Sequence, residues 1–380
     1  MDKLVLLMNR TNISLAVLAG VIAIAGGDGA WNARAALAAQ ARGHSLPIFE
    51  VDRAWPNVPA KWKLGDVSSF AVDAKDNVWL LHRPRTLLKP DEARMAAPPV
   101  MVFDSAGNFI KGWGGAGTGY EWPQREHGIH LDHKGFVWVS GNNCPTNGIA
   151  GLEPVADDQL LKFTQDGKFV MQIGHSNQSK GNADTRNVHR AADMSVYAKT
   201  NELFVADGYG NDRVVVFDAD SGKFKRMWGA FGNKPVDDDS CVVVTPKTFP
   251  DGPGPQSFNI VHAIRVARDG MVYVADRENR RVQLFTTDGK FVRQLVKTDT
   301  QFARNLALSA DPGQQFLYVG NGQEIAVVDR KAFQIAGSIK VPGQIGGGHH
   351  IATDSKGNIY IAQTGNGFQK LTFKGMPSTQ

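Results

Sequence analysis

Three histidines occupy the same position in a repeated pattern along the chain, and imidazole nitrogens are frequent zinc ligands. Each stands eleven residues before an aromatic residue and eight residues before a glycine; they are His127, His262 and His349. A single histidine at such a place usually caps a strand or bonds to a loop carbonyl. Three of the ten histidines share this position in the repeat, which favours a common role for them as metal ligands. Three imidazoles meeting at one point leave the fourth position of a tetrahedral zinc site open, which is the arrangement of catalytic zinc.

Three further residues with useful chemistry follow the same pattern. Arg83 and Arg277 stand fifteen residues after the register position, and Tyr209 stands sixteen after it. An arginine can hold a carboxylate through two hydrogen bonds, and a tyrosine can transfer protons. The spacing places all three residues on loops just past the inner strand. That is the opposite end of the strand from the histidines, unless the loops fold back. For Arg277 a structural interpretation is equally good, because DRENRR (276–281) is typical of a salt-bridged turn.

Other polar residues lie in or beside this register. In the first and third units the position is held by Ser68 and Asp193. His82 and His350 flank it, and we interpret them as groups that could orient the metal ligands. The remaining histidines break the phase and are interpreted as surface or structural residues.

The elements that must position these residues are short β-strands joined by polar or glycine-containing turns. Similar segments recur along the chain, among them LDHKGFVWVSG (131–141), VARDGMVYVADR (266–277) and TDSKGNIYIAQT (353–364). Six units of four strands predict an all-β fold, a six-bladed β-propeller. We expect the register residue to precede the innermost strand of each blade, at the mouth of the central channel. An open β-sandwich or two smaller barrels are the alternatives.

The two ends of the repeat region carry a prediction about ring closure. The last unit, residues 353–373, lacks its outer strands. Residues 47–54 (PIFEVDRA) are expected to supply what is missing and close the ring.

The N-terminal segment is typical of an export signal. Lys3 and Arg10 precede an apolar run over residues 13–26, and small residues follow. The run is shorter than the ~20 residues needed to span a bilayer. We therefore expect a secretory signal and linker over residues 1–42, a propeller over 43–380, and a secreted or periplasmic protein without a membrane anchor after signal removal. Export would permit a disulfide between Cys144 and Cys241, although two separate thiols are equally compatible with the sequence.

Composition limits the classes of partner. The chain has 380 residues, 42% of them hydrophobic and 21% charged, which is ordinary for a folded globular protein. The formal net charge of +5 is small for this length, and no basic run stands out. A nucleic-acid partner is therefore not expected.

Three separated motifs, ADGYGNDRVVVF, HAIRVARDGMVYVADRENRRVQLF and HHIATDSKGNIYIA, resemble the peptidyl-α-hydroxyglycine α-amidating lyase family of NHL-repeat propellers. The resemblance covers about residues 65–372 and implies an NHL-type propeller. It implies zinc bound by His127 in EHGIHLD, His262 in NIVHAIRV and His349 in GGGHHIA, in agreement with the register. It further implies an essential tyrosine at Tyr209 and substrate-site arginines at Arg83 and Arg277. Arg304 in FARNLAL matches a further arginine of the family.

The resemblance also implies a reaction and its cofactors. The reaction is that of a carbon–nitrogen lyase, which cleaves the N–Cα bond of a small or peptide substrate with an α-hydroxyglycine-like end, giving a primary amide and glyoxylate. Zn²⁺ would activate the hydroxyl, and Tyr209 would act as the base. The family's structural Ca²⁺ is doubtful in this chain, because the aspartate expected after the third zinc ligand is His350. Ca²⁺ prefers oxygen ligands.

Two other functions remain open from the sequence. One is a different metal-dependent propeller enzyme, such as a hydrolase or lactonase. The other is a non-catalytic NHL propeller that binds a protein or carbohydrate on one face, since a fold does not fix a function. Metal content separates the lyase from the second of these.

Overall fold

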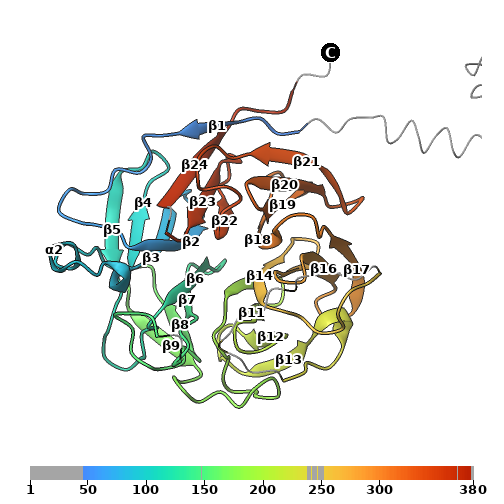
Figure 1. Ribbon diagram of the computed structural model, residues 1–380, viewed down its shortest axis with the longest axis horizontal. Helices are drawn as coiled ribbons and strands as arrows, with labels where there is room; N and C mark the ends of the chain where they lie inside the picture. Colours follow the sequence, from blue (N-terminus) through green and yellow to red (C-terminus); the bar gives the residue numbers. More distant parts are fainter. Residues whose placement is uncertain are drawn as a thin grey trace, which may run out of the picture. The chain divides into compact units, whose positions relative to one another are not determined.

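Six four-stranded antiparallel sheets surround a central channel in the computed structural model (Figure 1), which describes residues 46–146, 148–237, 241, 246, 252–365 and 367–377. The fold is therefore the predicted six-bladed β-propeller. The expected signal over residues 1–42 lies outside the described residues. Within the described part, no helix is long and apolar enough to cross a membrane.

Each of the first five blades is one continuous stretch of chain whose strands run in order from the channel outward. Blade one contains β2 (Asp66–Val72), β3 (Val78–Arg83), β4 (Val100–Phe103) and β5 (Phe109–Trp113); blade two contains β6 (Glu126–Leu131), β7 (Val137–Gly141), β8 (Leu160–Phe163) and β9 (Phe169–Ile173). Blade three contains β10 (Asp193–Tyr197), β11 (Glu202–Asp207), β12 (Arg213–Asp218) and β13 (Phe224–Trp228).

The next two blades repeat this arrangement. Blade four contains β14 (Val261–Val266), β15 (Val272–Asp276), β16 (Arg281–Phe285) and β17 (Phe291–Val296); blade five contains β18 (Phe302–Leu308), β19 (Phe316–Asn321), β20 (Glu324–Asp329) and β21 (Gln334–Lys340). The only helical elements in the described residues are short: η1 (Pro84–Thr86), α2 (Pro90–Ala93) and η2 (Ala230–Gly232).

Blade six joins the two ends of the propeller. It consists of β22 (His350–Thr353), β23 (Ile359–Gln363) and β24 (Gly367–Phe373), and β1 (Phe49–Asp52) pairs antiparallel with β24 as the outermost strand (Figure 1). The N-terminal stretch therefore closes the ring as the sequence predicts. The last unit lacks only its outermost strand, because β24 forms the third strand of the blade and β1 supplies the fourth.

Apolar contacts lie chiefly between neighbouring blades. Six buried clusters fill the six blade interfaces; one, for example, joins Trp79 of blade one to Val137 and Val139 of blade two. The aromatic residues of the repeat are buried on the second strand of their blades: Trp79, Trp138, Phe204, Tyr273 and Tyr360. Burying one such side chain is worth about 1.5–3 kcal/mol. A blade cannot bury both faces alone, so closure of the ring completes the core.

This placement corrects the interpretation of the first hairpin. The aromatic residues mark the second strand, and the strand before it in sequence lines the channel. Because the two strands are antiparallel, the end of the second strand returns to the start of the first: Arg83 pairs with Asp66. Residues such as Arg83 therefore lie at the same end of the blade as the register histidines. The sequence left this question open, and the antiparallel pairing answers it in favour of the histidine end.

Cys144 and Cys241, whose pairing the sequence left open, form a disulfide across a separation of 97 residues. A crosslink of this span restricts the unfolded chain strongly. We predict that Cys144→Ser lowers the free energy of unfolding by about 2–4 kcal/mol, measured by denaturant titration. Reducing agent should lower the stability of the parent by a similar amount and leave the variant unchanged. Two free thiols in the denatured, unreduced parent would contradict the pairing.

Candidate metal centre

The three register histidines meet at one end of the central channel. His127 and His262 lie near the start of β6 and β14, and His349 directly precedes β22, so the residues come from blades two, four and six. Their side chains are almost fully buried, and one ligand atom from each lies within 4.8 Å of the others. The Nε2 atoms of His127 and His349 are 3.1 Å apart. The structure thus brings together all three residues that the register singles out.

Local irregularity of the inner strands aims two of these rings. The pairing of β6 with β7 shifts between Glu126 and Ile129, and the pairing of β14 with β15 shifts between Val261 and Ala263. His127 and His262 therefore lie within β-bulges, which turn a side chain away from the regular alternation of a strand. His349 lies just before its strand and is held by a hydrogen bond from its backbone N–H to the Ala362 carbonyl, at 2.6 Å.

Backbone carbonyls of the intervening blades fix the orientation of each imidazole. His127 Nδ1 donates to the Ala192 carbonyl at 2.7 Å, His349 Nδ1 to the Ser68 carbonyl at 2.8 Å, and His262 Nδ1 to the Arg304 carbonyl. A carbonyl oxygen can only accept, so in each ring Nδ1 carries the proton and Nε2 presents its lone pair to the centre. This pattern of support is common around metal-bound histidines.

The supporting carbonyls occupy the same structural position as the histidines. In every blade an aromatic residue of the second strand pairs with a residue of the inner strand. The residue three places before that inner-strand partner is the equivalent position in each blade. In blade order these residues are Ser68, His127, Ala192, His262, Arg304 and His349. Histidines thus alternate with carbonyl acceptors around the channel. The sequence alignment placed Asp193 in this register, and that was wrong. In blade three the paired residues Ser195 and Phe204 are nine positions apart in sequence, whereas in blade two His130 and Trp138 are eight apart. The blade-three hairpin therefore has one additional residue, which shifts the equivalent position from Asp193 to Ala192.

Burial and geometry suit a zinc ion. Burial, followed by the charges of neighbouring histidines and arginines, lowers the pKa of all three imidazoles well below the ordinary value, so they stay neutral at physiological pH. Neutral imidazole is the form that binds metal. Two nitrogens bound tetrahedrally to one zinc at about 2.0–2.1 Å lie roughly 3.3–3.4 Å apart, close to the observed 3.1 Å between His127 Nε2 and His349 Nε2.

Tyr209 lies against the histidine cluster. Its hydroxyl is 3.1 Å from both His127 Nε2 and His262 Nε2 and accepts a hydrogen bond from Arg277 Nη1 at 2.9 Å. The Arg277 guanidinium also lies over the Tyr209 ring, 5.3 Å from its centre. A proton-transfer group and a cation are therefore in contact with each other at the metal-ligand atoms.

Arg277 and Arg83 surround this centre on different blades. Burial opposes the charge of Arg277, but Tyr209 and Glu278 together raise its pKa above the ordinary value, and Glu278 accepts a hydrogen bond from Arg277 Nε at 2.7 Å. The salt-bridged turn expected for DRENRR is therefore present, and the same arginine also reaches Tyr209. Arg83 is 3% exposed and donates from Nε to the Glu126 carbonyl at 2.7 Å. Burial lowers the pKa of Arg83 to about 10.

Two histidines expected to support the centre have other partners. His82 accepts a hydrogen bond from the Gly65 N–H and bonds through Nε2 to the Pro98 carbonyl, within blade one. His350 accepts from the Phe70 N–H at 3.4 Å and contacts Arg265 Nη2 at 3.0 Å through Nε2. Neither ring touches the three register histidines. The orienting groups are backbone carbonyls, which side-chain identity cannot reveal.

The residues around His350 do not suit a calcium ion. Burial raises the pKa of the Asp193 carboxyl, but the Arg265 charge and His350 outweigh it and lower that pKa to about 2. Arg265 Nη1 donates to Asp193 Oδ2 at 2.5 Å. A guanidinium thus lies beside the imidazole, where a hard cation would need oxygen ligands. The Asp193–Arg265–His350 cluster instead connects blades three, four and six.

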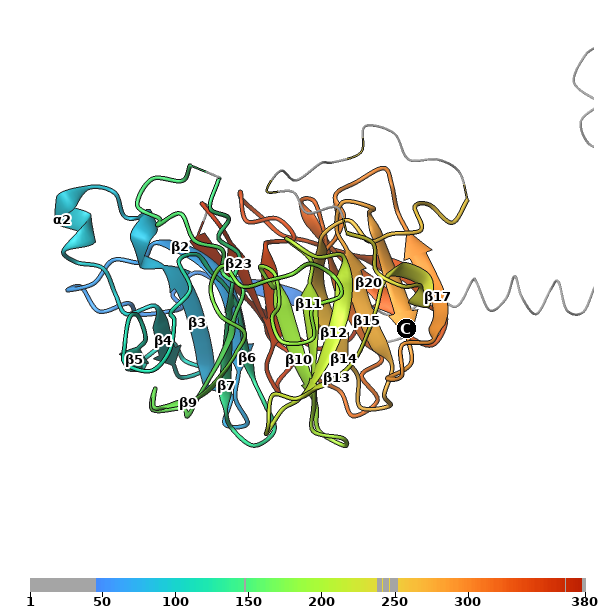
Figure 2. The ribbon, with the colours of Figure 1, turned by 90° about the horizontal axis from the view of Figure 1, so that it is seen from below.

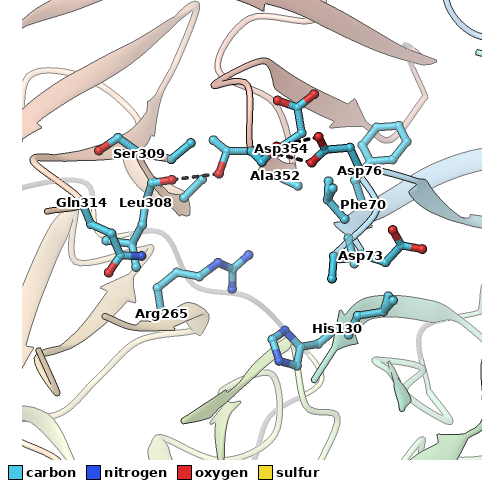
Figure 3. A pocket seen from close by; sticks show the side chains of 18 of the residues that line it. Phe70, Asp73, Asp76, His130, Arg265, Leu308, Ser309, Gln314, Ala352 and Asp354 are labelled. Atoms are coloured by element: carbon cyan, nitrogen blue, oxygen red, sulfur yellow. Dashed lines mark hydrogen bonds between the residues drawn. The ribbon is translucent and has the colours of Figure 1, made fainter. Parts of the chain in front are cut away.

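The other mouth of the channel contains a separate hollow of about 360 Å³ (Figure 3), and none of the three register histidines lines it. Arg265 points into this hollow from the paired cluster. Its acidic residues cap hairpin turns: Asp73 accepts from the Trp79 ring nitrogen, and Asp354 from the Tyr360 hydroxyl. Figure 2 shows the propeller from the side, with the inner strands running between its two faces.

Comparisons with known proteins point to the same family as the sequence motifs. No family model matches the chain. It is 29% identical over 291 residues to a protein named peptidyl-glycine alpha-amidating monooxygenase A from Xenopus laevis, covering 72% of this chain and 27% of that protein. It is 25% identical over 254 residues to a probable peptidyl-alpha-hydroxyglycine alpha-amidating lyase from Caenorhabditis elegans, covering 63% and 61%.

A further relative and a solved structure agree with the fold. NHL repeat-containing protein 3 of Mus musculus is 25% identical over 64% of this chain. A solved streptogramin B lyase superposes with a TM-score of 0.52 at 12% identity, covering 86% of this chain and 98% of that one, which concerns the fold alone. The chain spans about a quarter of the length of the monooxygenase relatives. The predicted resemblance is confirmed: this six-bladed propeller is a relative of proteins named as α-amidating monooxygenases, peptidyl-α-hydroxyglycine α-amidating lyases and NHL-repeat proteins.

Proposed function

We propose that this protein is a zinc-dependent lyase that cleaves the N–Cα bond of an N-acyl-α-hydroxyglycine, giving a primary amide and glyoxylate. The observation that carries the proposal is the cluster of three buried imidazoles, two of which, His127 and His262, contact the Tyr209 hydroxyl, while Arg277 bonds to the same hydroxyl. Relatives named as lyases of this type support the choice of reaction.

His127, His262 and His349 would hold the ion through Nε2. Bound there, Zn²⁺ would supply Lewis acidity and make a substrate hydroxyl easier to deprotonate. Their Nδ1 bonds to carbonyls prevent the rings from rotating out of position. Because the rings are preoriented, little conformational entropy has to be lost when ligand binds.

Tyr209 is the base in this proposal. The α-hydroxyl of the substrate gives its proton to the Tyr209 oxygen, the C–O bond becomes the carbonyl of glyoxylate, and the N–Cα electron pair leaves with the amide nitrogen. In this proposal Tyr209 starts the step as the tyrosinate, and the amide nitrogen takes up the proton that the Tyr209 oxygen received, so Tyr209 returns to its starting state and the protons balance over a turnover. Arg277 Nη1, 2.9 Å from the Tyr209 oxygen, stabilises negative charge on it.

Arg83 binds the substrate carboxylate in this proposal. In the described part of the chain no carboxylate pairs with its guanidinium, and its bond from Nε to the Glu126 carbonyl holds the side chain in place. A buried cation without an acidic partner is costly unless an anion joins it. The carboxylate of an α-hydroxyglycine end is such an anion.

We further propose that the protein is exported, as the N-terminal segment indicates. A disulfide between Cys144 and Cys241 suits an oxidising compartment, because disulfides rarely persist in the cytosol.

The metal ligands can be tested one at a time. We predict about one zinc per chain in protein purified without chelator, and loss of most of it in His127→Ala, His262→Ala and His349→Ala, because two imidazoles rarely retain zinc. Elemental analysis is the measurement. His175→Ala is the matched control, since His175 is exposed and contacts Glu121 at the surface. Parent protein that binds no zinc even on reconstitution would contradict the site.

The base can be tested by removing one oxygen atom. We predict that Tyr209→Phe lowers kcat about 10²-fold or more, the usual contribution of a positioned general base, and leaves zinc content and the unfolding midpoint near those of the parent. Glyoxylate release from an N-acyl-α-hydroxyglycine measures kcat. Tyr197→Phe, in the same blade, is the matched control and should keep full activity. Activity of Tyr209→Phe within about threefold of the parent would remove this residue from the mechanism.

Arg83 should affect binding in a different way. We predict that Arg83→Lys raises KM about tenfold or more, because an ammonium cannot reproduce two parallel bonds to a carboxylate. The ester of the same substrate, which lacks the carboxylate charge, should be processed about equally by parent and variant. An equal rise in KM for acid and ester would show that Arg83 acts through the fold, and a KM unchanged for both would remove it from recognition.

A further inference from the structure

A second group of arginines lines a cavity beside the histidine centre. The cavity has a volume of about 200 Å³ and lies between blades four and five; its walls are Arg277, Glu278, Arg280, Gln301, Phe302 and Arg304. Arg277 links it to the reacting centre, since the same guanidinium bonds to the Tyr209 hydroxyl. A ligand group in this cavity would therefore be attached to a molecule already bound at the histidines.

The charges of the cavity are unbalanced. Three guanidinium groups line it against one carboxylate, Glu278, which bonds to Arg277 at 2.7 Å. Arg304 donates from Nη1 to the neutral side-chain oxygen of Gln301 at 2.8 Å, and within the described ranges no carboxylate lies at ion-pair distance from it. Burial and the charge of Arg277 lower the pKa of Arg304. An anion in the cavity would offset this repulsion.

The position of Arg304 is fixed by the same strand that supports the metal ligand. Its backbone carbonyl accepts the Nδ1 proton of His262, at the register position of blade five. The side chain extends from this point into the cavity. A change of the Arg304 side chain therefore leaves the carbonyl that orients His262 in place.

One carboxylate does not satisfy both Arg83 and Arg304. The carboxylate of an α-hydroxyglycine is bonded directly to the hydroxylated carbon, so it stays next to the centre, where Arg83 serves it in the proposed function. Arg83 belongs to blade one and is no part of the cavity wall, whereas Arg304 belongs to blade five. Arg83 and Arg304 lie on different blades and, among the residues that the structure describes, neither has an acidic partner, so they call for two anionic groups.

We propose that the cavity lined by Arg304 is a specificity site for a second carboxylate, carried by the acyl part of the substrate. This inference rests on the proposed lyase function and narrows its substrate class to N-acyl-α-hydroxyglycines whose acyl group ends in an acid. The second carboxylate bonds to Arg304 and lies close to Arg277 and Arg280, whose positive charges favour it. Charge-assisted bonds of this kind discriminate strongly against neutral isosteres.

The test compares two substrates that differ only in this charge. N-succinyl-α-hydroxyglycine carries the second carboxylate, and N-succinamoyl-α-hydroxyglycine has a neutral amide in its place. We expect the parent to favour the acid by about tenfold or more in kcat/KM, chiefly through KM. Arg304→Gln should abolish this preference and Arg304→Lys should retain part of it, with zinc content unchanged in both. The matched control Arg53→Gln, at an exposed residue, should keep the full preference.

A binding experiment separates this inference from the lyase reaction. N-succinylglycine and N-succinamoylglycine lack the hydroxyl and cannot react, so calorimetry on the zinc-loaded protein reports recognition alone. Tighter binding of the acid that disappears in Arg304→Gln supports the specificity site even if no glyoxylate is ever released, in which case only the lyase proposal fails. Equal binding of both compounds by the parent, or a preference that survives Arg304→Gln, overturns the specificity site whatever the enzyme does.

Discussion

The hydrogen bonds from the three histidine Nδ1 atoms to backbone carbonyls are the interactions on which the rest of the site depends. Each bond crosses from one blade to the next: His127 to Ala192, His262 to Arg304 and His349 to Ser68. Because each carbonyl lies in an inner strand or directly before one, the ring orientations follow from the packing of neighbouring blades. The three histidines therefore meet only where blades two, four and six are each packed against the next blade of the ring.

Positive charge distinguishes the mouth of the channel that contains the histidines. Arg83, Arg277 and Arg304 gather around neutral imidazoles and one tyrosine, and among the described residues the one carboxylate that bonds to any of them is Glu278, on Arg277. Such a surface holds its positive charge at a cost unless an anion is bound. At the far side of the histidines, Asp193 pairs with Arg265, and that charge is balanced within the protein. We therefore propose that Arg83 and Arg304, which have no acidic partner among the described residues, serve a ligand, whereas Arg265 serves the fold.

The sequence predicts the architecture well because the repeat is long and its core residues are strongly patterned. Six units, the closing strand and the three histidines all follow from that pattern. The sequence predicts less well which end of a blade each residue occupies. The aromatic residues belong to the second strand and not to the innermost one, so Arg83 at the end of β3 lies at the same end of the blade as the histidines. A one-residue difference in hairpin length likewise placed Asp193 in the register where Ala192 belongs. Spacing along the chain gives neither the end of the blade nor the equivalent residue, because both depend on which residues pair across the hairpin.

Other parts of the site leave no signal in side-chain identity. Ala192 and Ser68 act through their carbonyls, so no residue type there would suggest a role. The pairing of Arg265 with Asp193 joins residues 72 positions apart and depends on the packing of blade three against blade four, its neighbour in the ring.

The most direct test of the central claim is glyoxylate release from an N-acyl-α-hydroxyglycine by the purified protein, before and after removal of metal and again after zinc is restored. We predict activity that disappears with chelation and returns in proportion to bound zinc, reaching its maximum at about one ion per chain. Zinc bound at the three histidines without glyoxylate release, above the uncatalysed rate, from any N-acyl-α-hydroxyglycine would contradict it.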